Sequence, residues 1–163
     1  MKNKYKIGII PGDGIGRDVV KAALIVLKTV DAVVGKLDLE FINMDVGETA
    51  VSKYNDPFPK ETKDRIAQTD AVLFGAAGNP FTSTILNGFR RGFDLYAGVR
   101  PIKSLPGIRS IQPNADLIIV RENTEGLFRK VGYIDGDYHV NLRVFTRKGM
   151  ERILRFCFEL AIK

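Results

Sequence analysis

The sequence predicts an α/β fold built on a mostly parallel β-sheet. Short apolar runs alternate with stretches of helical periodicity in the first half of the chain, a pattern typical of a parallel sheet covered by helices on both faces. An Asp-Gly pair between two extended runs nearer the C-terminal end predicts an added β-hairpin. The chain has 163 residues, 45% of them hydrophobic and 27% charged, so it is long enough for a hydrophobic core.

The elements of the first half follow from periodicity and turn residues. The run YKIGII predicts a buried strand, and the runs DLEFINM and AVLF predict two more. Apolar residues recur at helical spacing after the first strand, a short helix should follow the second, and a polar helix lies beyond the turn NDPFP. The expected strands are 5–10, 38–44 and 71–74, and the expected helices begin after residue 16 and cover 46–54 and 60–68.

The segment PGDGIG, residues 11–16, joins the first strand to the first helix. A glycine loop at a helix start can bind an anion, because free backbone N–H groups face the loop. Gly12, Gly14 and Gly16 are spaced G-x-G-x-G. Arg17 stands where the dinucleotide fingerprint G-x-G-x-x-G has its last glycine. The spacing alone therefore does not establish nucleotide binding.

The segment GAAGNPFTST, residues 75–84, follows the third expected strand. Its small residues allow a ligand to approach the backbone closely. A flexible connector is the alternative interpretation of the same composition. Residues 83–87 are expected to form a turn before a short helix that carries Arg90.

Three arginines lie in a region that we interpret as a binding site for a small acid. Arg100 and Arg121 end the hydrophobic runs LYAGVR and LIIVR, and side chains at strand ends tend to point into a ligand cleft. Arg90 lies on the short helix before them. Guanidinium groups bind carboxylates through paired hydrogen bonds, so three of them suit an acid with several carboxylates. Ordinary surface cations are the alternative, and composition does not separate the two.

The C-terminal third predicts a hairpin and a helix. The runs LFRKVGYI and YHVNLRVF flank the turn Asp-Gly-Asp at 135–137. His139 lies in the second of these strands, and we expect a structural or surface role for it, because the chain has no second histidine for a metal site. Thr146 is the expected N-cap of a helix that runs to Lys163. The apolar face of this helix consists of Ile153, Phe156, Cys157 and Leu160.

Charge and cysteine content restrict the possible functions. The formal net charge is +6, which fits nucleic-acid binding, attraction of anionic ligands or a solvated basic surface, and the scattered cations favour the last. The single cysteine excludes an internal disulfide framework. No apolar run approaches the roughly 20 residues of a membrane helix, and the N-terminal segment lacks a signal-peptide layout. These features predict a cytoplasmic protein with neither membrane nor nucleic-acid partners.

Four motifs follow one another along nearly the whole chain. They are IGIIPGDGIGRDV (7–19), AVLFGAAGNP (71–80), FRRGFDLYAGVRP (89–101) and LIIVRENTEGLF (117–128). Together, in this order and spacing, they resemble the N-terminal half of the isocitrate/isopropylmalate dehydrogenase family, which includes homoisocitrate and tartrate dehydrogenases. The resemblance implies a three-layer sandwich with a mostly parallel sheet, here incomplete, plus a β-hairpin arm.

The resemblance also implies a domain layout and a partner. Residues 1–100 would form the N-terminal part of a first, cofactor-side domain. Residues 101–163 would begin a second domain for substrate and dimerisation, with the hairpin arm at 127–145. In the family this arm pairs with the same arm of a second subunit to form a homodimer, which makes physical sense because an isolated hairpin is only marginally stable.

The activity implied by the resemblance is oxidation of a 2-hydroxy acid by NAD or NADP followed by decarboxylation. The acid would be of the isocitrate, homoisocitrate or 3-isopropylmalate type, and Mg²⁺ or Mn²⁺ would polarise its hydroxyl. In the family, the arginines that match Arg90, Arg100 and Arg121 bind the malate part of the substrate. The metal ligands are expected from the C-terminal half of such an enzyme, with none within this chain.

Further site residues are carried over by resemblance. The turn before Arg90 reads the substrate's substituent, and here its cues conflict. Thr84 resembles the isocitrate and homoisocitrate types, whereas Leu86 resembles the isopropylmalate type. Asn87 suits a distal carboxylate, which tips the balance toward a tricarboxylic acid. The cofactor would lie along two small-residue segments at Ile10, Gly12, Asp13, Gly14, Ala76, Ala77 and Gly78.

The chain departs from the family in two respects. The family's tyrosine falls seven residues after the arginine of VRENTEG, where this chain has Phe128, which has no hydroxyl to relay a proton. Tyr133 lies too far along a regular strand to replace it. The family's catalytic lysine, aspartate metal ligands and glycine-rich cofactor loop have no matching motifs here.

Three hypotheses remain open. The first is an N-terminal, truncated part of a dehydrogenase. The second, which Phe128 favours, is a non-catalytic ligand-binding or regulatory relative that keeps the arginine clamp. The third is an unrelated nucleotide- or nucleic-acid-binding domain.

Overall fold

The computed structural model describes residues 4–35 and 38–162. The chain forms two compact units, Met1–Gly88 (unit 1) and Phe89–Lys163 (unit 2). The division into domains at 1–100 and 101–163, expected by resemblance, stays a prediction.

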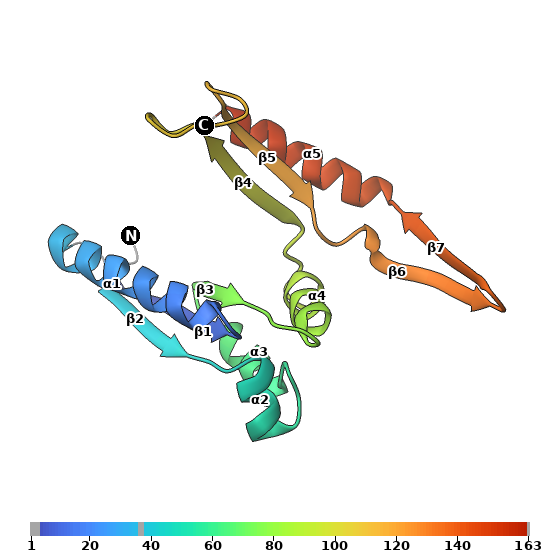
Figure 1. Ribbon diagram of the computed structural model, residues 1–163, viewed down its shortest axis with the longest axis horizontal. Coiled ribbons are helices and arrows are strands. Elements are labelled where there is room, and N and C mark those ends of the chain that lie inside the picture. Colours follow the sequence, from blue (N-terminus) through green and yellow to red (C-terminus); the bar gives the residue numbers. More distant parts are fainter. Residues whose placement is uncertain (1–3, 36–37, 163) are drawn as a thin grey trace. The chain divides into compact units, whose positions relative to one another are not determined.

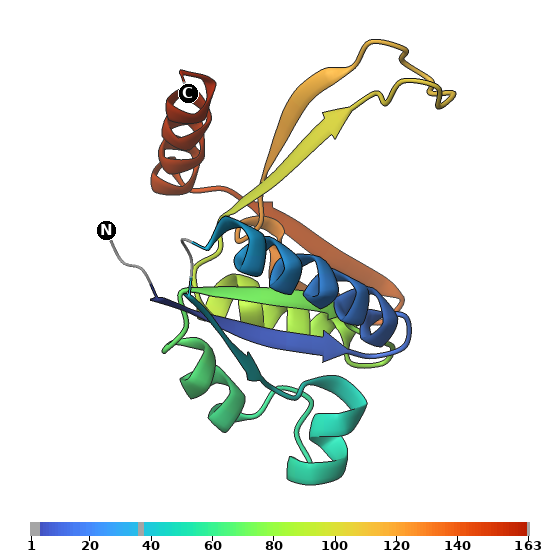
Figure 2. The same ribbon diagram turned by 90° about the vertical axis from the view of Figure 1, so that its left-hand side faces the viewer.

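Unit 1 is built on a three-stranded parallel sheet. Its strands are β1 (Lys4–Gly12), β2 (Asp38–Asn43) and β3 (Ala71–Ala76), in the spatial order β2-β1-β3. Helix α1 (Gly16–Val34) connects β1 to β2 and packs along the sheet, as Figures 1 and 2 show. The predicted α/β fold with parallel strands is confirmed. The ends of β1 and β3 lie two residues beyond the predicted ends, because Gly12 is still paired with Ala76.

Three further helices complete the chain up to the end of unit 1. They are α2 (Gly47–Tyr54), α3 (Lys60–Ile66) and α4 (Thr82–Gly92), the last of which continues into unit 2. Phe58 and Ile85 are almost fully buried. A Cβ at Gly88 would lie 2.3 Å from Cδ1 of Phe58, so glycine lets α4 pack directly on this ring. Residues 83–87, expected as a turn, instead belong to α4 because this packing holds them helical.

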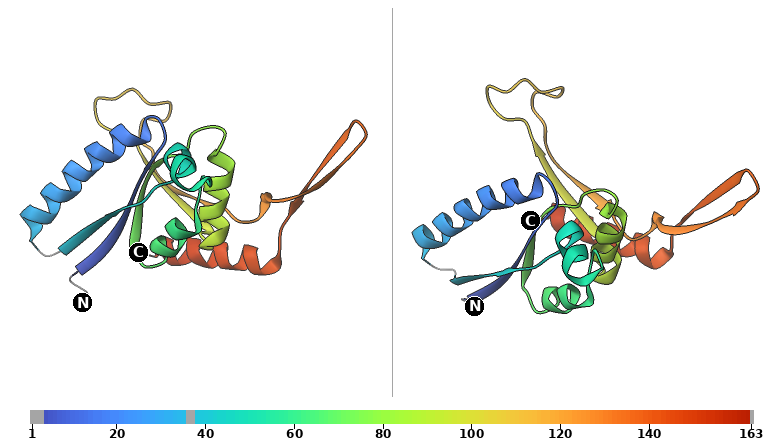
Figure 3. Two further views of the ribbon diagram at one scale, coloured as in Figure 1. Left: turned by 90° about the horizontal axis from the view of Figure 1, so that it is seen from below. Right: turned by 60° about the horizontal axis from the view of Figure 1, so that its bottom comes forward.

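Unit 2 contains two antiparallel strand pairs and a helix. Strand β4 (Ala97–Lys103) pairs with β5 (Asp116–Glu122), β6 (Gly126–Asp135) pairs with β7 (Tyr138–Val144), and α5 (Arg147–Ala161) follows. In both views of Figure 3 the β6–β7 hairpin extends away from α5 and from the β4–β5 pair. The predicted hairpin arm is confirmed, and the parallel pairing is found in unit 1.

The β4–β5 pair corrects one expectation about the arginines. Strand β4 continues past Arg100 to Lys103, so the expectation that Arg100 ends a strand is wrong. The extension is held by pairing with β5, where Lys103 lies opposite Asp116 and their side chains form an ion pair of 2.8 Å. Three successive apolar residues of β5, at 117–119, are each about half exposed, so both faces of this pair carry uncovered apolar surface.

The hairpin closes with a two-residue turn. Asp135 is paired with Tyr138, so Gly136 and Asp137 form the loop, one residue later than an Asp-Gly turn would place it. Gly136 has a φ of +52°. Glycine at the first central position is the pattern of a type II′ turn, which matches the twist of the flanking strands.

Strand β6 also contains a bulge near its start. Gly126 pairs with Val144, and the next pair along the strands is Val131 with Leu142. Residues 127–130 of β6 therefore lie opposite a single residue of β7, Arg143. Bulges of this kind turn side chains out of the regular strand alternation.

Helix α5 begins at the predicted cap. The Thr146 hydroxyl oxygen accepts a hydrogen bond from the Gly149 N–H at 3.0 Å. Ile153 is buried on the apolar side of the helix, and Cys157 is half-buried. The predicted helix end at Lys163 lies outside the described residues. In the part of the chain that the structure describes, no helix is long and apolar enough to cross a membrane.

Candidate functional site: an arginine cluster

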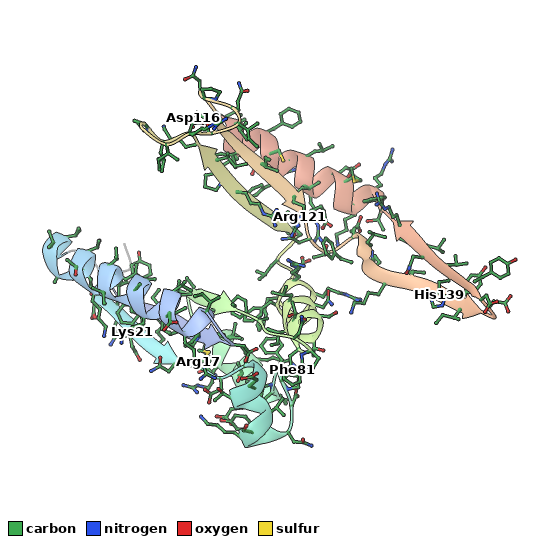
Figure 4. The ribbon with its side chains drawn as sticks, viewed as in Figure 1. Arg17, Lys21, Phe81, Asp116, Arg121 and His139 are labelled. Atoms are coloured by element: carbon green, nitrogen blue, oxygen red, sulfur yellow. The ribbon has the colours of Figure 1, made fainter. Side chains whose placement is uncertain are left out.

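The β4–β5 register sets the positions of two of the three predicted arginines. Arg121 is paired with Gly98, and Arg100 lies two residues further along β4. Paired residues, and residues two apart on one strand, project from the same face of a sheet. Arg100 and Arg121 are therefore diagonal neighbours on one face. In Figure 4, Asp116 and Arg121 lie near the two opposite ends of β5.

The Arg121 side chain is held by an amide. Its Nε donates to Oδ1 of the buried Asn123 at 2.9 Å, and the Asn123 backbone N–H donates to the Tyr96 carbonyl. Gly98 makes this possible, because a Cβ there would lie 2.6 Å from the Asn123 Nδ2. The neutral amide orients the guanidinium without neutralising it.

Phe128 brings Arg90 into the same cluster. The guanidinium carbons of Arg90 and Arg121 lie 5.0 Å and 5.5 Å from the centroid of the Phe128 ring. Both distances are within the range of cation–π attraction. Phe128 lies within the bulge of β6, where side chains depart from the regular strand alternation.

The cluster carries a net positive charge. Partial burial lowers the pKa of the Arg121 guanidinium, and the nearby charges of Arg100 and Arg90 lower that pKa further. Among residues 4–35 and 38–162, no carboxylate forms an ion pair with any of the three arginines. Guanidinium groups recognise carboxylates, so this arrangement is consistent with the predicted site for a small acid, and the binding role of the three arginines stays a prediction.

The first half of α4 flanks Arg90 along the helix. Leu86 and Asn87, four and three residues before Arg90, share its side of the helix, whereas Thr84, six residues before, lies on a different side. The Asn87 Nδ2 donates to the carbonyl and hydroxyl oxygens of Ser83 at 2.6 Å and 3.1 Å. Leu86 and Asn87 are thus better placed than Thr84 to accompany Arg90.

The residues predicted to bind the cofactor meet in unit 1. Gly12 pairs with Ala76 so closely that a Cβ on Gly12 would lie 1.8 Å from the Ala76 carbonyl oxygen, and the Asp13 N–H donates to that oxygen at 2.9 Å. The Asp13 carboxylate accepts from the Gly78 N–H at 2.8 Å. Ile10 is fully buried, and Ala77 is half-buried. The two small-residue segments are therefore brought together, while their role toward a cofactor stays a prediction.

Asp13 has a structural role that the sequence did not suggest. Its other carboxylate oxygen accepts from the Glu48 N–H at 2.9 Å, in the first turn of α2. The N-cap of α2 is Val46, whose side chain offers no acceptor, so Asp13 caps the helix from a distance. The carboxylate is 35 residues away in sequence, and no local pattern indicated this contact.

The first three N–H groups of α1 are already bonded within the loop. The N–H groups of Gly16, Arg17 and Asp18 donate to the carbonyls of residues 13, 14 and 15. The anion-binding interpretation of PGDGIG relied on unpaired groups at this position. The segment's observed contacts are structural.

Another arginine of unit 2, Arg152, lies close to carboxylate side chains. Arg152 of α5 donates to both carboxylate oxygens of Asp94, at 3.0 Å and 2.8 Å, and to the Thr124 hydroxyl at 2.7 Å. It lies 3.7 Å from Glu122 and 4.4 Å from the centroid of the Tyr96 ring. These contacts fasten α5 to the segments before β4 and after β5.

Sequence reasoning missed Asn123, Gly98 and the residues of this second group. A polar residue two positions after a strand-end arginine is a weak signal for Asn123, and no local signal marked Gly98. His139 is exposed on the hairpin arm, toward the turn (Figure 4). Within the described residues, no group of three or more His, Cys, Asp or Glu side chains is arranged to hold a metal ion.

Comparison with known proteins identifies the family of this chain. A sequence model described as isocitrate/isopropylmalate dehydrogenase matches residues 6–163. The 3-isopropylmalate dehydrogenase of Methanothermobacter thermautotrophicus is 43% identical over 158 residues, which cover 97% of this chain and 46% of that protein. The homoisocitrate dehydrogenase of Methanocaldococcus jannaschii is 35% identical, over 97% of this chain and 48% of that protein.

A solved structure shows the same fold. The crystal structure of isocitrate dehydrogenase from Methylococcus capsulatus superposes with a TM-score of 0.85 at 33% identity, over 96% of this chain and 47% of that one. The chain thus spans a little under half the length of the relatives it matches. It belongs to the isocitrate/isopropylmalate dehydrogenase family.

Proposed function

We propose that this chain forms the acid-binding part of an NAD(P)-dependent decarboxylating dehydrogenase. The substrate class is a 2-hydroxy acid of the isocitrate, homoisocitrate or 3-isopropylmalate type. The observation that carries the proposal is the cluster of Arg90, Arg100 and Arg121, in which the described residues supply no ion-paired carboxylate. Such a cluster is costly without a ligand and favourable with a polycarboxylate.

The arginines would bind and orient the acid. Arg100 and Arg121 project from one face of the β4–β5 pair, so they suit two oxygens of neighbouring carboxylates. Arg90 comes from α4, and its guanidinium carbon lies 5.0 Å from the centroid of the Phe128 ring. Holding both carboxylates fixes the hydroxyl-bearing carbon between them, which is the positional contribution that a binding site makes to catalysis.

Residues on α4 would contact the substituent that distinguishes these acids. Leu86 shares the side of Arg90 and favours an apolar substituent, as in 3-isopropylmalate. Asn87 keeps its amide oxygen available while its Nδ2 is bonded to Ser83, so this oxygen disfavours a third carboxylate. The tricarboxylic preference suggested by the sequence is thereby weakened, and the assay below compares the acids directly.

A nicotinamide cofactor fits the small-residue segments of unit 1. Gly14 has open space where a Cβ would stand and Ala77 has a short side chain, so a ligand can approach their backbone, whereas Asp13 fills the corresponding space at Gly78. The bound cofactor would accept the hydride from the substrate carbon. Asp13, whose carboxylate is already bonded to Gly78 and Glu48, would hold these segments in place.

A divalent cation, which the family implies, does not find a ligand set in the described residues. The proposal therefore assigns no Mg²⁺ or Mn²⁺ ligand to this chain and depends on no metal-bound step.

The arm at β6 and β7 would pair with a second copy to give a homodimer. Its exposed Tyr133, Ile134 and Tyr138 supply apolar surface for such pairing. With one cysteine in the chain, we place the protein in the reducing cytoplasm.

A second candidate function is acid binding without turnover. Phe128 occupies the position of the family's tyrosine and cannot relay a proton. The candidate keeps the arginine cluster as a sensor of small acids.

One experiment tests the proposal and separates the candidates. Isothermal titration of the purified chain with 3-isopropylmalate, isocitrate and homoisocitrate should give saturable binding, which Arg100→Ala should abolish. Arg155→Ala, an exposed arginine of α5 outside the cluster, is the matched control. Absence of binding by the unaltered chain would refute both candidates.

Turnover is then followed in a complete enzyme that carries this chain, as reduction of NAD or NADP with Mg²⁺ or Mn²⁺ present, because this chain has no motifs that match the family's catalytic lysine and metal ligands. Binding together with cofactor reduction supports the dehydrogenase. Binding without reduction supports the sensor. In a complete enzyme, Phe128→Tyr should raise turnover on the order of 10²-fold, as a positioned proton donor does.

A further inference from the structure

We infer that Phe128 is a positioning residue of the arginine cluster, whose ring holds Arg90 and Arg121 ready for an acid while leaving their charge available. The inference rests on the proposed acid-binding function and assigns to Phe128 a role of its own. At this position the chain has no hydroxyl, so the ring face is what the residue offers to its neighbours.

Arg90 and Arg121 share the ring of Phe128. Two guanidinium carbons lie 5.0 Å and 5.5 Å from one centroid. Two like charges this close to a common point repel each other. The negative face of an aromatic ring attracts both cations and so opposes that repulsion.

The Phe128 ring does not neutralise the charge of the two arginines. A carboxylate in place of Phe128 would hold the arginines more strongly, but it would also satisfy them and compete with an incoming acid. The Asn123 amide follows the same logic, since it orients Arg121 with a neutral oxygen. The cluster is therefore built from neutral partners, which preserve its affinity for anions.

The backbone at Phe128 is rigid. The Phe128 N–H donates to the Glu125 carbonyl at 3.2 Å. The next residue, Arg129, forms an ion pair of 3.2 Å with the buried Glu125 carboxylate, which also accepts hydrogen bonds from the N–H and hydroxyl of Thr146. The ring thus sits on a bulge anchored to the start of α5, and an anchored ring can preorganise mobile arginines.

The decisive test changes the ring's electrostatics without changing its shape. Replacing Phe128 by 3,4,5-trifluorophenylalanine retains the ring and removes most of the negative potential of its face. We expect the dissociation constant for 3-isopropylmalate or isocitrate to rise roughly 5- to 30-fold, the effect of losing a partly desolvated cation–π contact. Phe128→Leu should give a similar loss, whereas Phe128→Tyr should stay within about twofold of the unaltered chain, since its ring is retained.

A second readout does not need a ligand. In the acid-free chain, the δ-methylene protons of Arg90 and Arg121 should show upfield ring-current shifts in NMR spectra, which Phe128→Leu should remove. Phe158→Leu, at an exposed aromatic residue of α5 outside the cluster and the arm, is the matched control and should change neither readout.

The outcomes separate the inference from the proposed function. Acid binding that is unchanged by both trifluorophenylalanine and leucine would overturn the role of Phe128 while leaving the acid site intact. An equal loss in the trifluorophenylalanine, leucine and tyrosine variants would also overturn it, because it would indicate packing only. An unaltered chain that binds no acid would refute the proposed function and this inference together.

Discussion

Arg152 and Arg121 lie in the same unit and each faces an aromatic ring, yet their surroundings are opposite. Arg152 is bonded to Asp94 through two hydrogen bonds and lies near Glu122. Arg121 has the neutral Asn123 amide and two neighbouring arginines. Arg152 has a structural role, and carboxylates within the protein neutralise its charge. Among the described residues, Arg121 forms no ion pair that would neutralise its charge.

This difference offers a way to distinguish binding arginines from structural ones. Exposure does not separate the two, since both side chains are partly buried. The identity of the hydrogen-bond partner does, because a carboxylate partner cancels the charge and an amide or a ring does not. Variants of the two kinds of arginine and of their neutral partners test that distinction.

Arg121→Ala should weaken acid binding by about 2–5 kcal/mol, the cost of removing one partner of a buried charge pair in the complex. The free energy of unfolding should stay unchanged or rise, because the change relieves repulsion from Arg90 and Arg100. Titration calorimetry and urea denaturation measure the two quantities on the same sample. A large loss of stability would place Arg121 with the structural arginines.

Arg152→Ala should lower the free energy of unfolding by about 2 kcal/mol, because Glu122 and Thr124 lose a charged partner. Arg147→Ala, on the same helix, is the matched control. Its ion pair with Glu151 is exposed, so its loss should change stability by less than about 0.5 kcal/mol. Equal effects in urea denaturation would remove the contrast on which the comparison depends.

Gly98→Ala should weaken acid binding by about 1 kcal/mol. The added Cβ would displace the Asn123 amide, and Arg121 would lose one hydrogen bond to a neutral oxygen. Gly92→Ala, where a Cβ meets no atom within 4 Å, should leave affinity unchanged. Calorimetry with the same acid would contradict this view of Asn123 if both variants bound equally well.

Thr146→Ala should cost about 1 kcal/mol of stability through loss of the α5 cap, and Thr146→Ser should recover most of it. Neither change should affect the arginine cluster's affinity by as much as Arg121→Ala. Thermal or urea unfolding gives the stability difference. A cap effect larger than that of Arg152→Ala would reverse the order proposed here.

Low pH should weaken the contacts that the Glu125 carboxylate makes with Thr146 and Arg129. Hydrogen bonds from Thr146 and then from Arg129 hold the pKa of Glu125 below its ordinary value of 4.5. A carboxyl whose folded pKa is depressed stabilises the protein above its unfolded pKa, and this contribution is lost as the pH falls through the folded pKa. Stability should therefore decline below about pH 4.5, and Glu125→Gln should flatten that decline in unfolding curves measured against pH.

Much of the fold was predictable because it depends on patterns of residues that are close together in the sequence. Alternating strands and helices predicted the parallel sheet of unit 1, and Thr146 before an apolar periodicity predicted the cap of α5. The three arginines were identified by the motifs around them. These features depend on residues that lie close together in sequence.

The features that escaped prediction depend on distant contacts. Asp13 caps α2 from 35 residues away, and Gly98 matters because Asn123 lies across the strand pair. The antiparallel pairing of β4 with β5 carries Arg100 into the middle of its strand. Phe128 was noticed for its missing hydroxyl, whereas its two guanidinium contacts need the bulge to be seen.

That bulge also separates two tasks of the hairpin. Residues 127–130 absorb the mismatch opposite Arg143, and regular pairing resumes at Val131. Adding one paired residue to each strand beyond this point would lengthen the arm by about 3.4 Å and leave the aromatic ring where it is. The length of the arm and the position of the Phe128 ring beside Arg90 and Arg121 can therefore be changed independently of each other.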